Sequence, residues 1–178
     1  MTMIERAAGL SDTDIRTTQR LIDDARRSGL TRFQVLALVR PGDAEDLVLM
    51  LDRAEDDVWT VPVAWVHPTE TFAHALDWLC EEHLGLLDWA VGFAGTVGYE
   101  SPDGVETLQL AFDITVPADG TLAWTGPCQW WRTSTEPPVC HPLTRPIVER
   151  LRTHADPTHA DRAQDDADQG GRGRGDRA

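Results

Sequence analysis

One segment of the chain changes its hydrophobic period, and this change limits the folds that the sequence can form. Between residues 69 and 84, the side chains that share one side of an α-helix are largely apolar, namely Phe72, Ala75, Leu76, Leu79 and His83. Gly85 predicts the end of this helix. The segments before and after it have the shorter apolar runs and the turn residues of strands. The sequence therefore predicts a helix between two groups of strands.

The strands before this helix are predicted to begin with a hairpin. The apolar runs 33–39 and 47–51 are separated by the turn-forming residues 41–46. Residues 58–66 are rich in Val and Trp, but Pro62 cannot donate a ladder hydrogen bond. We therefore expect a short strand or an extended loop there.

The strands after the helix are predicted to form a second hairpin. Residues 89–99 and 107–116 contain Val, Phe and Tyr and flank a Pro-Asp-Gly turn at 102–104. Shorter strands are expected at 122–124 and 129–132.

Two further helices are predicted near the ends of the chain. Ser11 and Asp14 have the spacing of a capping box, and the segment they begin ends near Gly29. Thr144 can cap a last helix that runs to residue 152. From residue 153 the chain consists mainly of Asp, Arg, Gly, Ala and Gln, which predicts a disordered tail over 153–178.

Length and charge exclude several classes of protein. The 178 residues fit one domain with extensions. The formal charge of −14 and the absence of lysine argue against nucleic-acid binding, which depends on phosphate neutralisation. No apolar stretch approaches a membrane span, and three cysteines without a framework spacing suggest reduced thiols in a cytoplasm. The Arg-, Ala- and Gly-rich composition is typical of a GC-rich genome, such as that of an actinobacterium.

The segment 64–86 resembles the signature of the Nudix hydrolase superfamily, and the likeness in element order extends over residues 32–152. That signature is a Gly, five residues, a Glu, seven residues, and then Arg-Glu-aliphatic-any-Glu-Glu-any-Gly-aliphatic, preceded by Trp-x-x-Pro-Gly-Gly. The matching residues here are Trp59 and Pro62 in the approach, then Glu70, Cys80 in the aliphatic position, Glu82, Gly85 and Leu86. The spacing fits without a gap. The resemblance implies an α/β/α sandwich with a small mixed β-sheet between helices, to which residues 1–31 add an N-terminal helical extension.

The chemistry of the signature is only partly present. Active members of the superfamily use its carboxylates to hold Mg²⁺ or Mn²⁺ against a diphosphate, because hard cations prefer oxygen ligands. Here the Arg-Glu pair is Trp78-Leu79, and His83 replaces the second of the paired glutamates. Only Glu70 and Glu82 remain as candidate metal ligands, so the resemblance implies a weak or absent metal site.

The other candidate site residues are one acid-base pair and a group of tryptophans. If the protein is active, Glu82 and His83 are the candidate catalytic residues, His83 as a base that titrates near neutral pH. Planar ligands can stack on tryptophan, and those nearest the expected cleft are Trp59, Trp65, Trp78 and Trp131. Each of these tryptophans also fits a role in the core.

Two functions remain open at this point. One is a Nudix-like protein without normal pyrophosphohydrolase activity that binds a nucleotide-like small molecule or a protein partner, as a ligand-binding, regulatory or accessory protein. The alternative is an atypical divalent-metal-dependent hydrolase of nucleoside diphosphate derivatives, with help from the acids Glu100, Glu106 and Asp113 of the second hairpin. Beside these two functions, a structural or assembly role is also open, such as a homodimer with the tryptophan-rich surface at its interface, because the superfamily is often dimeric.

Overall fold

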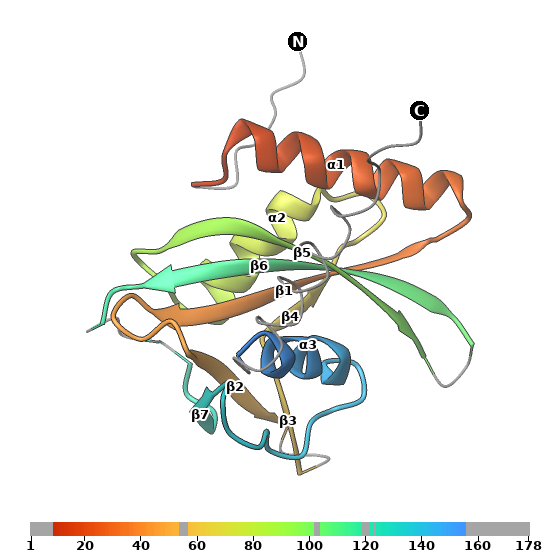
Figure 1. Cartoon of the computed structure of the whole chain (residues 1–178). Helices are drawn as coiled ribbons and strands as arrows, with labels where there is room; N and C mark the ends of the chain where they lie inside the picture. The colour runs from red at the N-terminus through yellow and green to blue at the C-terminus, as the bar shows by residue number, and fades with distance from the viewer. Residues whose placement is uncertain (1–8, 54–56, 102–103, 119–121, 123, 156–178) are drawn as a thin grey trace, which may run out of the picture.

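The computed structural model describes residues 9–53, 57–101, 104–118, 122 and 124–155. Its larger sheet has the strand order β4-β1-β6-β5 (Figure 1). The strands are β1 (Arg32–Pro41), β4 (Val63–Trp65), β5 (Ala90–Glu100) and β6 (Glu106–Val116). Strands β1 and β6 pair in parallel, whereas β4 and β5 pair antiparallel with their neighbours. The predicted second hairpin is confirmed as β5–β6.

A second sheet contains β3 (Val58–Thr60), β2 (Leu47–Arg53) and β7 (Cys128–Arg132), in the order β3-β2-β7. The predicted strands before the helix are therefore present, but their predicted pairing as a hairpin is wrong. Strand β1 is buried along most of its length and pairs with β4 and β6, so the chain after Pro41 crosses into the second sheet. Pro62 separates β3 from β4, and these two strands lie in different sheets.

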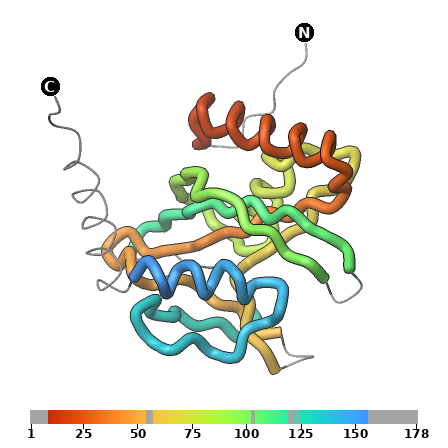
Figure 2. Tube along the Cα trace, turned by 45° about the vertical axis from the view of Figure 1, so that its right-hand side comes forward, coloured from red at the N-terminus to blue at the C-terminus, as the bar shows by residue number. Residues whose placement is uncertain are grey.

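Helices cover both faces of the larger sheet. Helix α1 (Asp12–Arg27) and helix α2 (Phe72–Asp77) lie on one side, and α3 (Arg145–Ala155) lies on the other side beside the smaller sheet (Figures 1 and 2). This arrangement confirms the predicted α/β/α layers and the additional N-terminal helix. The strands form two sheets, however, where one small mixed sheet was expected.

The alternation of side chains along β1 explains the two cores. Phe33 and Val35 belong to the core under α1 and α2, whereas Leu36 and Leu38 belong to the core shared with α3 and the smaller sheet. One polar residue of β1 is buried among them: Gln34 accepts a hydrogen bond of 3.1 Å from the amide of Gln109. The larger sheet is thus covered on both faces.

The ends of the chain agree with the sequence in part. The Ser11 side chain accepts a hydrogen bond from the Asp14 backbone N–H at 3.1 Å, which confirms the predicted cap of α1. Helix α3 continues to Ala155, three residues beyond its predicted end. Leu122 and Trp124 are not in a strand, and residues 1–8 and 156–178 lie outside the described residues. Among the described helices, none combines the length and the apolar character needed to cross a membrane.

The signature helix, which is the helical part of the signature-like segment over residues 72–83, departs from a regular α-helix halfway along its length. After α2, the π-helix η1 (Trp78–His83) follows, and the Leu84 N–H donates to the Leu79 carbonyl five residues earlier. A π turn contains more residues than an α turn, so the rotation of about 100° per residue around the axis of an α-helix no longer applies. Leu84 therefore lies in the core beside Leu79, and His83 is only partly buried. The expectation that His83 belongs to the apolar side is corrected accordingly.

Candidate functional site

A groove of about 360 Å³ lies between the edge strand β4 and helix α2. It is lined by Val63, Ala64, Trp65, Glu70, His74, Ala75 and Trp78. Alternation along β4 directs Ala64 towards the core and leaves Trp65 52% exposed. Trp78, at the start of η1, is 47% exposed. The structure thus brings together two of the four candidate tryptophans and one of the two candidate metal ligands.

Glu70 and His74 form the polar part of this groove. Thr71 caps α2, because its side chain accepts a hydrogen bond of 3.2 Å from the His74 backbone N–H. The Oε1 atom of Glu70 lies 4.0 Å from Nε2 of His74. His74 was not selected from the sequence as a site residue, although it lies four residues after Glu70, a spacing at which side chains meet on a helix.

The second candidate metal ligand, Glu82, does not join Glu70. Glu70 precedes α2 and Glu82 lies near the end of η1, so the six residues of α2 alone separate them by roughly 9 Å along the helical axis, at about 1.5 Å per residue. Ligand oxygens lie within roughly 2.0–2.6 Å of Mg²⁺ or Ca²⁺, so these two carboxylates do not share an ion in this arrangement. Glu82 is exposed and is not among the described residues that line the groove.

The acids of the second hairpin do not complete a metal site either. Asp113 lies between Phe112 and Ile114, which face α2, so its side chain points to the opposite face of the sheet. There, its Oδ1 atom accepts a hydrogen bond of 3.1 Å from Arg40. Glu100 and Glu106 face each other at the turn end of the hairpin. No three His, Cys, Asp or Glu side chains of the described residues are grouped so that they could hold a metal ion.

The environment of the signature helix also disfavours negative charge at its buried face. Leu79, in a glutamate position of the signature, is 0% exposed, and its neighbour Cys80 is equally buried. Burial raises the pKa of the Cys80 thiol to about 12, and the negative charges of Asp77 and Glu81 add to the shift. The residues present at this face therefore do not fit a divalent metal ion.

His83 is held between two aromatic rings. Its imidazole stacks on Trp78, with ring centroids 5.3 Å apart, and contacts Trp124 at 4.8 Å. The partial burial of the ring lowers the pKa of His83 from its ordinary value. His83 does not line the groove, so its position favours a packing role beside Trp78. Trp124 was predicted only as the end of a short strand at 122–124, so its contact with His83 was not expected.

The lowered pKa of His83 predicts a loss of stability in acid. The unfolded chain protonates this histidine more readily than the folded chain, so folding stability falls as the pH drops below about 6.5. The His83→Phe variant keeps a ring between the tryptophans but has no titrating group. As the pH is lowered from about 7.5 to about 5, we expect the free energy of unfolding of wild type, measured with urea, to fall relative to that of this variant. A difference that does not change with pH would contradict the prediction.

The other two candidate tryptophans lie away from the groove, on the smaller sheet. Trp131, on β7, is 4% exposed and belongs to the core shared with α3. Trp59, on β3, packs against the same core, and its backbone pairs with the segment around Cys140. These positions give both side chains packing contacts and separate them from Trp65 and Trp78.

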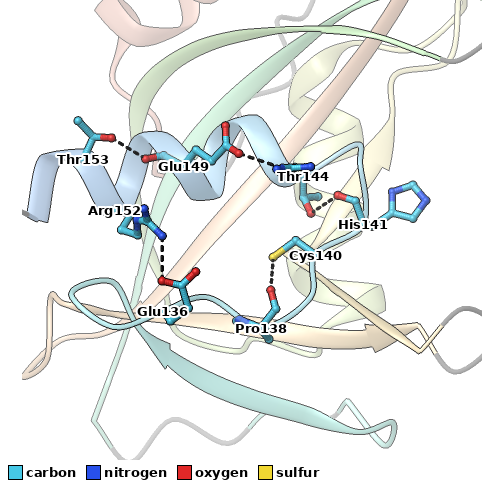
Figure 3. A network of polar contacts seen from close by, with 9 residues as sticks. Glu136, Pro138, Cys140, His141, Thr144, Glu149, Arg152 and Thr153 are labelled. Carbon is cyan, nitrogen blue, oxygen red and sulfur yellow. Dashed lines mark hydrogen bonds and ion pairs between the residues drawn. The ribbon is translucent and has the colours of Figure 1, made fainter.

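A larger hollow of about 650 Å³ lies between α3 and the segment that precedes it (Figure 3). Its two arginines are paired within the hollow, Arg152 with Glu136 at 3.0 Å and Arg145 with Glu149 at 2.9 Å. In Figure 3 the thiol of Cys140 is directed at the carbonyl of Pro138, whereas the ring of His141 points away from it. The hollow therefore has neither an unpaired arginine nor a thiol-imidazole pair among its described residues.

Comparison with known proteins identifies the fold. No protein-family model and no curated protein matches the sequence. Solved structures do match. The structure of the E. coli dihydroneopterin triphosphate pyrophosphohydrolase matches with a TM-score of 0.54 and 18% identity, and the match covers 71% of this chain and 99% of that one. The MutT protein from Methanosarcina mazei Go1 has a TM-score of 0.53 and 23% identity, covering 70% and 96%. A MutT NUDIX hydrolase from Burkholderia pseudomallei has a TM-score of 0.52 and 17% identity, and the match covers 66% of this chain and 95% of that one. The chain therefore has the fold of the Nudix hydrolases, as its signature-like segment implied.

Proposed function

We propose that this protein binds a small molecule on a Nudix fold without hydrolysing a diphosphate in the normal way of that fold. The observation that supports the proposal most is the burial of Leu79 in the position of a signature glutamate. A metal-bound diphosphate requires several carboxylate oxygens that converge on one place. Here one of those positions holds a buried aliphatic side chain, and another holds the stacked ring of His83.

The groove between β4 and α2 is the proposed ligand site. It combines apolar walls, two partly exposed indole rings and one carboxylate, which is the usual composition of a small-molecule site. One protein of similar fold, the E. coli dihydroneopterin triphosphate pyrophosphohydrolase, acts by its name on dihydroneopterin triphosphate, a small molecule that contains a planar ring system. Retention of a ligand groove without the full set of carboxylates supports a regulatory or accessory role for this chain.

Thermal unfolding in the presence of metal tests this proposal. We expect millimolar Mg²⁺ or Mn²⁺ to leave the melting temperature within about 1 °C of its value in chelator, because a metal stabilises only the state that binds it. An ion present at a hundred times its Kd would instead add about 2.7 kcal/mol, which corresponds to roughly 5 °C or more.

The Glu82→Gln variant is the matched control for that measurement. Glu82 is exposed, so this change leaves the fold intact. A metal-dependent rise in wild type that disappears in the variant would contradict the proposal and favour the atypical hydrolase, with Glu82 as a true metal ligand.

A further inference from the structure

We infer that the groove between β4 and α2 binds a planar organic cation, held between Trp65, Trp78 and the carboxylate of Glu70. The inference rests on the proposed function in one respect, namely that this groove is the ligand site. It goes further by naming the charge and the shape of the ligand, and it differs from the expectation of a polyphosphate.

The two tryptophans provide the first argument. Large aromatic side chains are usually buried, yet Trp65 and Trp78 are each about half exposed, and both line this groove. Indole is the aromatic ring that attracts cations most strongly, and its flat face also stacks on planar rings. Two such rings at one groove favour a ligand that is both flat and positively charged.

The charges of the groove provide the second argument. Glu70 contributes a carboxylate, and the described lining residues include no arginine, His74 being their one basic side chain. Proteins bind phosphate with arginine, lysine or converging backbone N–H groups. The overall formal charge of −14 adds a field that attracts cations and repels polyphosphates. The electrostatics of this groove therefore complement a cation.

Several parts of the groove are held in place before any ligand arrives. The backbone of Trp65 is fixed by its pairing with Gln34 in the sheet, and the ring of Trp78 is supported by His83. Glu70 lies next to the Thr71 cap, within 4.0 Å of His74. A volume of about 360 Å³ suits a ligand with one or two rings. Groups already held in place lose little conformational entropy on binding.

Calorimetric titration of the full chain with a matched pair of probes tests the inference. The cation 1-methylnicotinamide and the neutral nicotinamide share one flat ring and differ mainly in charge, and ADP represents a polyphosphate. We expect the cation to bind at least about fivefold more tightly than nicotinamide. Glu70→Gln should lower the affinity for the cation by about threefold to tenfold and leave the affinity for nicotinamide unchanged. Trp65→Leu should lower the affinity for the cation more than Trp65→Phe, which keeps an aromatic ring.

Trp130→Leu is the matched control, because Trp130 is 39% exposed on β7 and does not line the groove. It should bind the cation as wild type does. The inference would be overturned if the two nicotinamides bound equally well or if neither bound. It would also be overturned if ADP bound and Glu70→Gln raised the affinity for ADP. These results are separate from metal-dependent hydrolysis, which would overturn the proposed function while leaving a preference for cations intact.

Discussion

Leu79→Glu, which restores a glutamate of the Nudix signature, is expected to destabilise the fold by about 3–5 kcal/mol and not to create a metal site. Leu79, on η1, is completely buried in the core between this helical segment and the larger sheet. A carboxylate there loses its hydration, and its neighbour Cys80 already shows how strongly this environment disfavours an anion. Urea unfolding should detect the loss, and the melting temperature should fall by roughly 10 °C.

The control for this change is Leu79→Met, which keeps the volume and the apolar character of the side chain. It should cost less than about 1.5 kcal/mol. If Leu79→Glu were as stable as Leu79→Met and gained stability on addition of Mg²⁺, the buried face would be able to open into a metal site. That result would contradict the account given of this helix.

Phe112→Ala is the second change with a large expected effect, a loss of about 3–5 kcal/mol of folding stability. Phe112 lies on the central strand β6 and is completely buried. Its ring stacks on Phe72, the first residue of α2, with centroids 6.0 Å apart, and also contacts Phe93 of β5 at 5.6 Å. Removing the ring leaves a cavity beneath the helix that positions Trp78, so ligand binding in the groove should weaken as well.

Urea unfolding measures the loss, with Leu87→Ala as the control. Leu87 is 98% exposed, and its replacement should change stability by less than about 0.5 kcal/mol. Equal stabilities of the two variants would mean that the contact between α2 and the sheet does not hold the groove in place.

Local sequence signals predicted most of the elements because each signal acts within a few residues. The Ser11 cap, the end of the signature helix at Gly85 and the β5–β6 hairpin all depend on neighbours in the chain. Gly85 has a φ of +67°, and the Leu86 N–H returns to the Cys80 carbonyl at 2.9 Å, which is the geometry of a glycine helix end.

Tertiary pairing was less accessible from the sequence. Strands β1 and β2 follow each other around a Pro-Gly turn, as the strands of a hairpin do, yet β1 pairs in parallel with β6 more than sixty residues later. Nothing near β1 encodes this partner. The π-helix η1 was equally hidden, because the apolar pattern up to Leu79 fits an α-helix and the wider turn shows only in the placement of Leu84.

The candidate site was predicted in part for the same reason. Trp65, Glu70 and Trp78 were selected from the signature-like segment and line one groove. Trp59 and Trp131 were selected because they are tryptophans near the signature in the fold, and they lie on the smaller sheet. The side-chain type was informative, but the sheet to which each strand belongs depends on long-range pairing.

Product detection by mass spectrometry decides whether this protein hydrolyses diphosphates. Wild type and Glu82→Gln are incubated with a panel of nucleoside diphosphate derivatives in Mg²⁺, in Mn²⁺ and in chelator. We expect no metal-dependent cleavage product from either protein, because the buried Leu79 and the stacked His83 leave no converging set of carboxylates among the described residues. Metal-dependent cleavage by wild type that Glu82→Gln abolishes would contradict this expectation and establish an active hydrolase.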